Sequence, residues 1–299
     1  MSVYGSLPHL ASPLSHSEAK IRRYIVVGMR IKHKTQQADA VGSDHSNSIP
    51  LLSIVVPALN EQDNVAELVE QVRAAVIKPT AAHIDPINAE LIVVDDGSND
   101  ATLQRLTQMA AQHVWLRVLH RRHSMGQSAA MFAGIQTARG QWIGMLDADL
   151  QNDPADLPGM LKIALDGLAD VIQGDRTANR HDNATRRFAS WIGRSTRRFI
   201  LGDTIRDTGC TARVLRADIA KKLPLQFKGM HRFIPYYAQM IGARVIESPV
   251  HHRPRFSGNT KYGAFTRGVT GLFDCFAVRW MGNRYRDSTA RIEKSLTSE

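Results

Sequence analysis

The stretch Trp142-Ile143-Gly144-Met145-Leu146-Asp147-Ala148-Asp149-Leu150-Gln151 decides the fold of this chain. It is an apolar run that ends on two carboxylates, and burying these carboxylates without a cationic partner would be costly. Alternate residues of a strand point to the same side, so Asp147 and Asp149 at a strand's C-terminal end can face one ion. With Gln151 as a further oxygen ligand, they predict a site for Mg²⁺ or Mn²⁺. A solvated turn is the alternative interpretation of an isolated Asp-x-Asp.

Two further apolar runs also end in polar residues, which favours a ligand-binding interpretation. Residues 91–94 lead into Asp95-Asp96-Gly97-Ser98, and residues 52–56 lead into Pro57 and then Asn60-Glu61. Continuous apolar runs are typical of parallel strands that are covered on both faces. Ligands of open α/β sheets bind beyond the carboxyl ends of such strands. The three polar clusters are therefore expected to converge on one crevice.

The segments between these runs have helical spacing. Apolar residues recur over 65–76, with Asp63 available as a cap, and over 103–109, with a cap within 98–100. A fourth strand is predicted at 116–119, and a helix of small residues at 126–134. The alternation of strand and helix predicts a doubly wound α/β fold with a mostly parallel sheet.

With these motifs the chain resembles family 2 glycosyltransferases of the GT-A fold, and within them the polyprenyl-phosphate sugar transferases. The resemblance covers residues 51–285. The residues that carry it in the first half are Pro57, Asn60, Glu61, Asp95, Asp96, Gly97, Ser98, Asn99, Asp100, Thr102, Gly126, Ala129, Gly134, Ala138, Gly140, Asp147, Ala148, Asp149, Leu150 and Gln151. In the second half they are 174–176, 207–210 and 255–262.

The resemblance implies an inverting transferase that binds a nucleotide-sugar, expected to be a UDP-sugar rather than a GDP-sugar. Asp147, Asp149 and Gln151 would hold Mg²⁺ or Mn²⁺ on the diphosphate, whose charge grows as it leaves. The donor-binding residues that it implies are Pro57, Asn60, Glu61, Asp95, Asp96, Gly126, Asp147, Ala148 and Arg255. A turn and a helix cap is the plainer interpretation of Asp95-Asp96-Gly97-Ser98, and it does not exclude ligand contacts.

The acceptor half departs from relatives that glycosylate a hydroxyl, because His231-Arg232 stands where many of them carry an acidic pair. A phosphate acceptor explains the departure, since its second pKa of ~6 leaves it ionised without a base. It needs cations instead, and the expected phosphate-binding residues are Arg198, Arg206, Thr208 and Arg213. A hydroxyl acceptor with His231 as base stays the alternative.

The predicted catalytic residues are Asp149, Arg206, Arg213 and Lys261. Lys261 belongs to the basic loop 255–262, which Gly258 would allow to close over the donor.

Two stretches predict attachment to an anionic membrane surface. Between Arg186 and Arg216 there are eight arginines and only two acidic residues, interleaved with apolar side chains. A second apolar stripe runs over 265–281. Neither reaches the 18 apolar residues of a spanning helix. We expect a peripheral protein at the cytoplasmic face of the plasma (inner) membrane, with a membrane-protein subunit as a further partner. A salt-bridged surface helix and ordinary core packing are the alternatives.

Composition agrees with this interpretation. The 299 residues are 43% hydrophobic, which suffices for a full core, and two cysteines suit a reducing compartment. The expected organisation is a disordered arm at 1–49, a catalytic domain at 50–250, an acceptor loop and interfacial helix at 251–285, and a polar tail at 286–299. The net charge of +10 would also suit a non-catalytic lipid- or nucleic-acid-binding protein. Nucleic acid is not expected as a partner, because it leaves the carboxylate-tipped strands unexplained.

Overall fold

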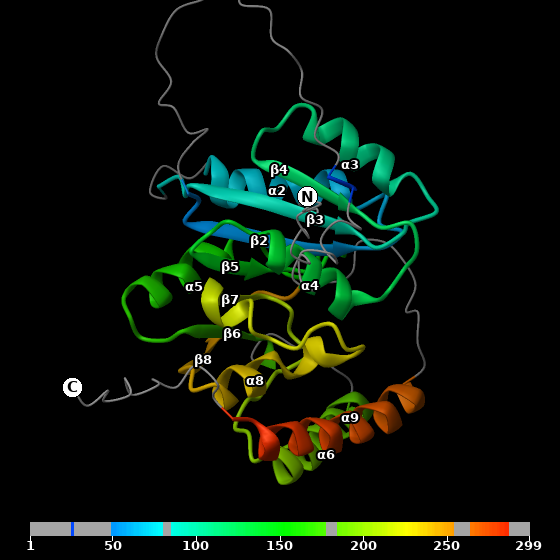
Figure 1. Cartoon of the computed structure of the whole chain (residues 1–299), viewed down its shortest axis with the longest axis vertical. Coiled ribbons are helices and arrows are strands. Elements are labelled where there is room, and N and C mark those ends of the chain that lie inside the picture. The colour runs from blue at the N-terminus through cyan, green and yellow to red at the C-terminus, as the bar shows by residue number, and fades with distance from the viewer. Residues whose placement is uncertain (1–24, 27–48, 80–84, 178–183, 254–263, 287–299) are drawn as a thin grey trace, which may run out of the picture.

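A computed structural model of the protein describes residues 25–26, 49–79, 85–177, 184–253 and 264–286. Strands and helices alternate through most of this range (Figure 1). The strands are β1 (Ile25–Val26), β2 (Leu52–Ala58), β3 (Ala89–Asp95), β4 (Leu116–His120), β5 (Trp142–Met145), β6 (Val171–Asp175), β7 (Arg213–Arg216) and β8 (Val245–Pro249). The helices are α2 (Val65–Val72), α3 (Thr102–Ala110), α4 (Gln127–Thr137), α5 (Asp156–Leu165), α6 (Ala184–Leu201), α7 (Ala217–Ala220), α8 (Ile234–Met240) and α9 (Ala264–Arg284). A π-helical turn, Arg73–Ile77, extends α2, and a 3₁₀ turn, Met230–Phe233, precedes α8.

The strands form one eight-stranded sheet in the order β1-β4-β3-β2-β5-β7-β6-β8. The pairs β4/β3, β3/β2, β2/β5 and β6/β8 are parallel, whereas β7 runs antiparallel to both β5 and β6. Short β1 lies in the predicted arm and pairs antiparallel with β4. The sheet is thus parallel from β4 to β5, the part predicted to bind the donor, and β7 joins this part to the rest.

The apolar strands are buried on both faces, as their unbroken sequence predicts. Ile54 and Val56 of β2 belong to a core cluster shared with α2 and α5, while Val55 between them faces a cluster on the opposite side. That second cluster receives side chains from α4, α8, α6 and α9. Because both faces are covered, the sheet can expose polar groups only at strand ends and in the loops beyond them.

The predicted elements over 52–58, 91–95, 116–119 and 126–134 are confirmed. Two local predictions are wrong. Strand β5 ends at Met145, so Asp147 and Asp149 lie in the turn that follows it and not on the strand. Helix α2 begins after Asn64, and Asp63 does not cap it but lies 3.8 Å from Arg105.

Helices α6 and α9 pack against each other at one end of the molecule, far from α3 (Figure 1). The predicted basic segment 186–216 is not one helical surface, because α6 ends at Leu201 and Arg213 and Arg216 lie in β7. Arg197 of α6 is buried and ion-paired to Asp203 at 2.9 Å. None of the described helices is both long and apolar enough to cross a bilayer.

Two helical glycines distinguish close packing from open surface. A Cβ at Gly134 of α4 would overlap Val55 and lie 3.1 Å from Val94 Cγ2, whereas a Cβ at Gly159 of α5 would meet nothing within 4 Å. Overpacking a core costs ~1–3 kcal/mol, and replacing a mid-helix glycine by alanine gains ~0.5–1 kcal/mol. We expect urea titration to show a lower free energy of unfolding for Gly134→Ala and a higher one for Gly159→Ala. Equal effects of both substitutions would contradict the packing of α4 on the sheet.

Candidate functional site

Asp147 lies where the two halves of the molecule meet. Its Oδ1 accepts a hydrogen bond of 2.8 Å from the Gln127 side chain at the start of α4. Its Oδ2 accepts one of 2.7 Å from the Thr211 hydroxyl, which comes from the segment before β7. Gln127 belongs to the donor half and Thr211 to the acceptor half. Asp147 therefore fixes the relative position of the two sides of the crevice.

The turn at Asp147–Gln151 is compact and charged. Asp149 is 9% exposed, its Oδ1 accepts the Gln151 N–H at 3.2 Å, and Leu150 has a φ of 62°. Burial and the nearby charge of Asp149 together raise the pKa of Asp147 to about 6, against the lowering effect of the Thr211 hydrogen bond. A buried carboxylate whose ionisation a neighbouring carboxylate opposes is a suitable place for a cation.

The donor set fits a hard divalent ion in part. Within the described residues, no group of three or more His, Cys, Asp and Glu side chains is placed to hold a metal. Asp147, Asp149 and the amide oxygen of Gln151 would supply oxygen ligands, and Mg²⁺ and Mn²⁺ commonly complete their shells with substrate phosphates and water.

The predicted donor residues Asp95 and Asp96 follow the end of β3, and both have partners within the chain. Asp95 Oδ2 lies 2.7 Å from His120 Nδ1, and its Oδ1 accepts the Ser98 N–H at 3.2 Å. Asp96 is buried and accepts hydrogen bonds from the segment 121–126. The donors are Arg121 Nη1, Ser124 Oγ and the N–H groups of Met125 and Gly126. Asp96 thus holds the segment that leads into α4 and Gln127.

The loop after β2 is fastened to the loop after β3. The Asn60 N–H donates to Ser98 Oγ at 2.9 Å, and Asn60 Oδ1 accepts the Asn99 N–H at 2.9 Å. The Glu61 N–H donates to the Thr102 hydroxyl at 2.8 Å. The structure therefore brings Asn60 and Glu61 next to the Asp95–Asp96 segment, with Pro57 partly exposed at the end of β2.

A polar cavity of about 120 Å³ opens beside Asp147. This volume far exceeds the ~10–15 Å³ that a single water needs. Residues of both halves line it, namely Gln127, Met131, Asp147, Thr208, Gly209, Thr211, Arg213, His231 and Arg232. The cavity joins two of the predicted acceptor residues, Thr208 and Arg213, to the predicted metal ligand Asp147.

His231, the alternative base, is held neutral. Burial, together with the charges of Arg232 and Arg213, lowers its pKa to about 3. Its Nδ1 lies 2.7 Å from Ser128 Oγ, which also accepts the His231 N–H at 3.2 Å. A base with so low a pKa takes up a proton poorly at neutral pH. His231 is therefore placed to shape the cavity.

Arg213 is a buried cation with little freedom. It is 2% exposed, its Nη1 donates to the His231 carbonyl at 3.0 Å, and its Nη2 donates to the Cys210 carbonyl. Its Nε has no hydrogen-bond partner among the described residues. Burial lowers its pKa to about 10, so it stays charged at neutral pH. Arg213 supplies fixed positive charge behind the cavity wall, since both of its terminal nitrogens are already engaged.

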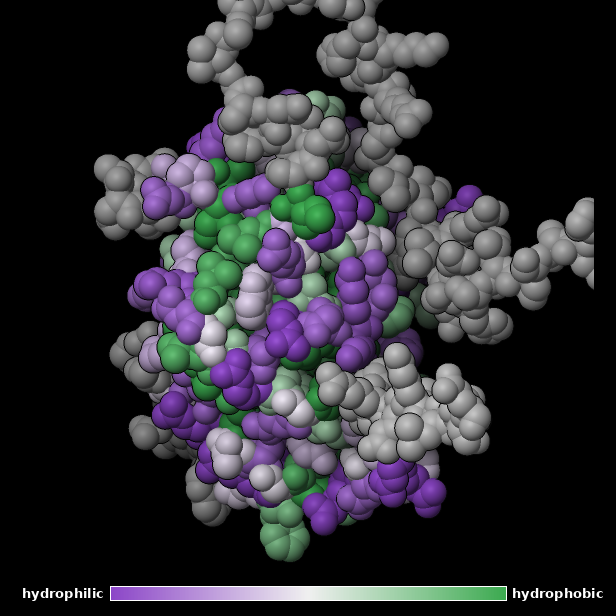
Figure 2. All heavy atoms as spheres, turned by 60° about the vertical axis from the view of Figure 1, so that its left-hand side comes forward, coloured by the Kyte–Doolittle hydropathy of each residue, from purple (hydrophilic) through white to green (hydrophobic). Residues whose placement is uncertain are grey.

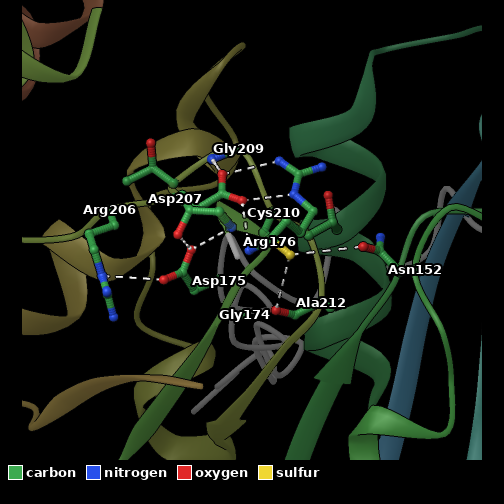
Figure 3. Close-up of polar contacts among 12 residues, drawn as sticks. Asn152, Gly174, Asp175, Arg176, Arg206, Asp207, Gly209, Cys210 and Ala212 are labelled. Atoms are coloured by element: carbon green, nitrogen blue, oxygen red, sulfur yellow. Dashed lines mark hydrogen bonds and ion pairs between the residues drawn. The ribbon is translucent and has the colours of Figure 1, made fainter. Parts of the chain in front are cut away.

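Arg206 belongs to an ionic network behind the loop 206–209 (Figure 3). Its Nε lies 3.2 Å from Asp175 and 3.3 Å from Glu247, and its side chain is 56% exposed. Arg176 pairs with both oxygens of Asp207, at 2.8 and 3.1 Å, and this pairing raises the pKa of Arg176 against the effect of burial. Carboxylates on neighbouring strands thus fasten this loop.

The other two residues predicted to bind the acceptor phosphate are Thr208 and Arg198, and only Thr208 lines the cavity. Thr208 Oγ1 accepts a 2.6 Å hydrogen bond from Arg197, the buried arginine of α6. Arg198 is exposed and donates to the Thr204 carbonyl at 3.1 Å. Arg198 does not line the cavity, so the structure does not bring it together with Asp147.

The predicted residues Arg255 and Lys261 lie outside the described residues. The segment before them is anchored beside the metal motif, because the Arg253 N–H donates to the Gln151 carbonyl at 2.9 Å and His251 Nδ1 lies 2.7 Å from Asp156.

Several site residues were missed by the sequence analysis. They are Gln127, Ser128, Gln173 and Thr211, which make contacts between distant segments, and Arg232, which lines the cavity. Gln173, for example, donates from its amide to the carbonyls of Asp207 and Cys210 at 2.9 and 3.0 Å. No local pattern identifies such a residue.

Solved structures of similar fold identify the architecture as GT-A. Glucosyl-3-phosphoglycerate synthase from Mycobacterium tuberculosis, solved with Mn²⁺, UDP and glucosyl-3-phosphoglycerate, has a TM-score of 0.56 and 19% identity over 77% of this chain and 80% of that one. A mannosyltransferase from Pyrobaculum calidifontis, solved with GDP-mannose and Mn²⁺, has a TM-score of 0.54 and 16% identity over 81% of this chain and 67% of that one.

The family follows from the sequence comparisons. The model of glycosyl transferase family 2 matches residues 53–224. Dodecaprenyl-phosphate galacturonate synthase of Rhizobium johnstonii is 39% identical over 82% of this chain and 71% of its own length. Undecaprenyl-phosphate 4-deoxy-4-formamido-L-arabinose transferase of Photorhabdus laumondii is 35% identical over 76% of this chain and 67% of its own length. The chain belongs to glycosyl transferase family 2 and is an inverting glycosyltransferase, as the sequence predicted.

Proposed function

We propose that this glycosyltransferase moves one sugar from a nucleotide-sugar, expected to be a UDP-sugar, to a polyprenyl phosphate such as undecaprenyl phosphate. The observation that carries the proposal is the composition of the cavity. It combines two arginines with a histidine whose pKa is lowered to about 3, and the only carboxylate among its described lining residues, Asp147, is hydrogen-bonded on both oxygens. Such a cavity suits an acceptor that brings its own negative charge. The polyprenyl phosphates in the names of the two relatives support the same acceptor class.

The proposed step needs no proton transfer to the protein. An oxygen of the acceptor phosphate attacks the anomeric carbon, the bond from that carbon to the nucleoside diphosphate breaks, and the configuration inverts. Arg213 stabilises the approaching phosphate by its charge, while Asp147, Asp149 and Gln151 would hold Mg²⁺ or Mn²⁺ near the diphosphate. When bound, the ion supplies counter-charge to the leaving group. The Mn²⁺ in the two structural neighbours agrees with a divalent ion.

The donor nucleotide is proposed to lie along the ends of β2 and β3, beside Asn60, Glu61 and the Asp95–Asp96 segment. Arg255 and Lys261 are proposed to close over its diphosphate. Unchanged activity of Lys261→Ala would remove Lys261 from the mechanism.

The first test of the proposal compares two acceptors of equal chain length. We expect transfer to undecaprenyl phosphate and at least 100-fold less transfer to undecaprenol, because a neutral alcohol needs a base that the described cavity lacks. Product formation from radiolabelled UDP-sugars is the measurement, with dolichyl phosphate as a further phosphate acceptor. Comparable rates with the alcohol would favour the alternative, a transferase that acts on hydroxyl groups.

The metal site is tested by removing one carboxylate. Asp149→Asn should lower turnover at least 100-fold, because the diphosphate loses counter-charge as it departs. Asp166→Asn is the matched control, since Asp166 is a 49% exposed carboxylate that pairs only with Lys162 among the described residues. Excess EDTA should abolish turnover of the wild-type enzyme, and added Mg²⁺ or Mn²⁺ should restore it. Full activity in EDTA would contradict metal dependence.

We also propose that the end formed by α6 and α9 rests on an anionic membrane surface, at the cytoplasmic face and with a membrane-protein subunit as a further partner. Large apolar side chains are exposed there: Phe199, Leu272, Phe273, Phe276 and Trp280. Arg284 stacks over the Trp280 ring at 5.0 Å. Figure 2 shows hydrophobic and strongly hydrophilic side chains side by side at the lower end of the molecule, where these helices lie. Such a mixture suits the boundary between headgroups and acyl chains.

The membrane proposal is tested by liposome co-sedimentation across a salt series. Full burial of a large apolar side chain contributes ~1.5–3 kcal/mol, so Phe273→Ser combined with Trp280→Ser should weaken binding to anionic vesicles at least tenfold. Val114→Ser is the control, because Val114 is 98% exposed before β4, away from α6 and α9. A wild-type protein that stays in the supernatant at low salt would contradict attachment through this surface.

A further inference from the structure

Arg232 lines the cavity beside Asp147 and has no counter-ion in contact. Its guanidinium makes no hydrogen bond or ion pair to any described residue, and only its backbone N–H is bonded, to the Gly229 carbonyl at 3.3 Å. Its charge acts on Asp274 of α9, whose pKa is raised by burial and lowered by Arg232. Three other arginines near this site, Arg176, Arg197 and Arg206, differ because carboxylates hold them.

The residues around Arg232 favour a negatively charged ligand. Behind it stands the buried cation Arg213, whose Nε has no partner, and beside it stands neutral His231. Thr208, Gly209 and Thr211 add hydroxyl and backbone groups to the wall. A guanidinium offers a planar fork that matches the two oxygens of a carboxylate or a phosphate.

We propose that Arg232 binds an oxyanion directly in this cavity, with Arg213 as fixed charge behind it. The proposal rests on the proposed function for the reaction that it serves, and it adds a residue that the sequence analysis did not select. Arg206 and Arg213 were the arginines predicted to bind the acceptor phosphate, but both are engaged within the chain. The proposal therefore gives the direct contact with the oxyanion to Arg232.

The oxyanion can come from either of two sources. One is the phosphate of the lipid acceptor. The other is a carboxylate on the transferred sugar, as in a uronic acid. Both sources present the same chemistry to a guanidinium, and they differ in which substrate loses affinity when Arg232 is replaced.

The experiment measures kcat/KM for the nucleotide-sugar donor and for the polyprenyl-phosphate acceptor. The proteins are wild type, Arg232→Gln, Arg232→Lys and the control Lys222→Gln, which removes an exposed charge. The donors are UDP-glucuronate, UDP-galacturonate and their neutral counterparts UDP-glucose and UDP-galactose. We expect Arg232→Gln to lose at least 20-fold with the natural substrate pair, and Arg232→Lys to recover part of this loss through its point charge. Lys222→Gln should stay within twofold of wild type.

The two sources separate in the pattern of that loss. If the oxyanion is the acceptor phosphate, kcat/KM for the lipid falls with every donor, while hydrolysis of the donor by water is unchanged. If it is a sugar carboxylate, wild type prefers uronate donors, and Arg232→Gln removes this preference in both transfer and hydrolysis. Activity of Arg232→Gln within twofold of wild type on both substrates would overturn the proposal.

Failure of the proposed function would be recognised separately, as a wild-type enzyme that transfers no sugar to any polyprenyl phosphate. The oxyanion site would then be judged by binding. A saturable thermal shift with farnesyl phosphate or with glucuronate that is lost in Arg232→Gln would support the site, and equal shifts in both proteins would overturn it.

Discussion

The crevice depends on the two hydrogen bonds of the Asp147 carboxylate. One comes from Gln127 at the start of α4 and the other from Thr211 before β7, so a single side chain joins the donor half to the acceptor half. The cost of this arrangement is visible in the pKa of Asp147, which burial and Asp149 raise to about 6. A carboxylate in such a position is stabilised by cations. The fixed charges of Arg176 and Arg213 already act in this direction, and a divalent ion would act more strongly.

In the predicted acceptor half, several arginines are paired with carboxylates of the chain and are therefore not available to a ligand. Arg176, Arg197 and Arg206 look alike in sequence, but carboxylates hold each of them and thereby fix the loop 202–212. Burying an arginine such as Arg197 is costly unless its partners are well placed. The effect of these ion pairs is to hold Thr208 and Gly209 against the cavity. Of the two arginines that line it, Arg213 is bonded to carbonyls, whereas the guanidinium of Arg232 makes no hydrogen bond or ion pair to a described residue. Pairing therefore determines which arginine is available.

The donor half could be predicted from sequence because its signals are local. Unbroken apolar runs at 52–56 and 91–95 identify buried parallel strands, and the carboxylates that follow them mark the edge where ligands bind. One local prediction failed, namely that Asp147 and Asp149 lie on the strand, and this failure also has a physical reason. An Asp-x-Asp at the end of an apolar run does not reveal whether the strand continues, and here β5 ends at Met145 and is followed by a turn in which Leu150 has a positive φ. The two predicted ligands, Asp147 and Asp149, lie close together, but in a turn and not on a strand.

The acceptor half could not be predicted in the same way, because its contacts join residues far apart in the chain. A run rich in arginine suggests an exposed basic surface, yet Arg213 is 2% exposed, and its terminal nitrogens bond to the carbonyls of Cys210 and His231. These hydrogen-bond acceptors are main-chain carbonyls, which every residue has, so the sequence does not identify them. Asp96 makes the same point on the donor side. Its motif suggests a ligand contact, but its bonds to Ser124, Met125 and Gly126 give it a positioning role as well, because they set where α4 and Gln127 begin. The carboxylate that a motif identifies can thus act on the substrate through the helix that it holds.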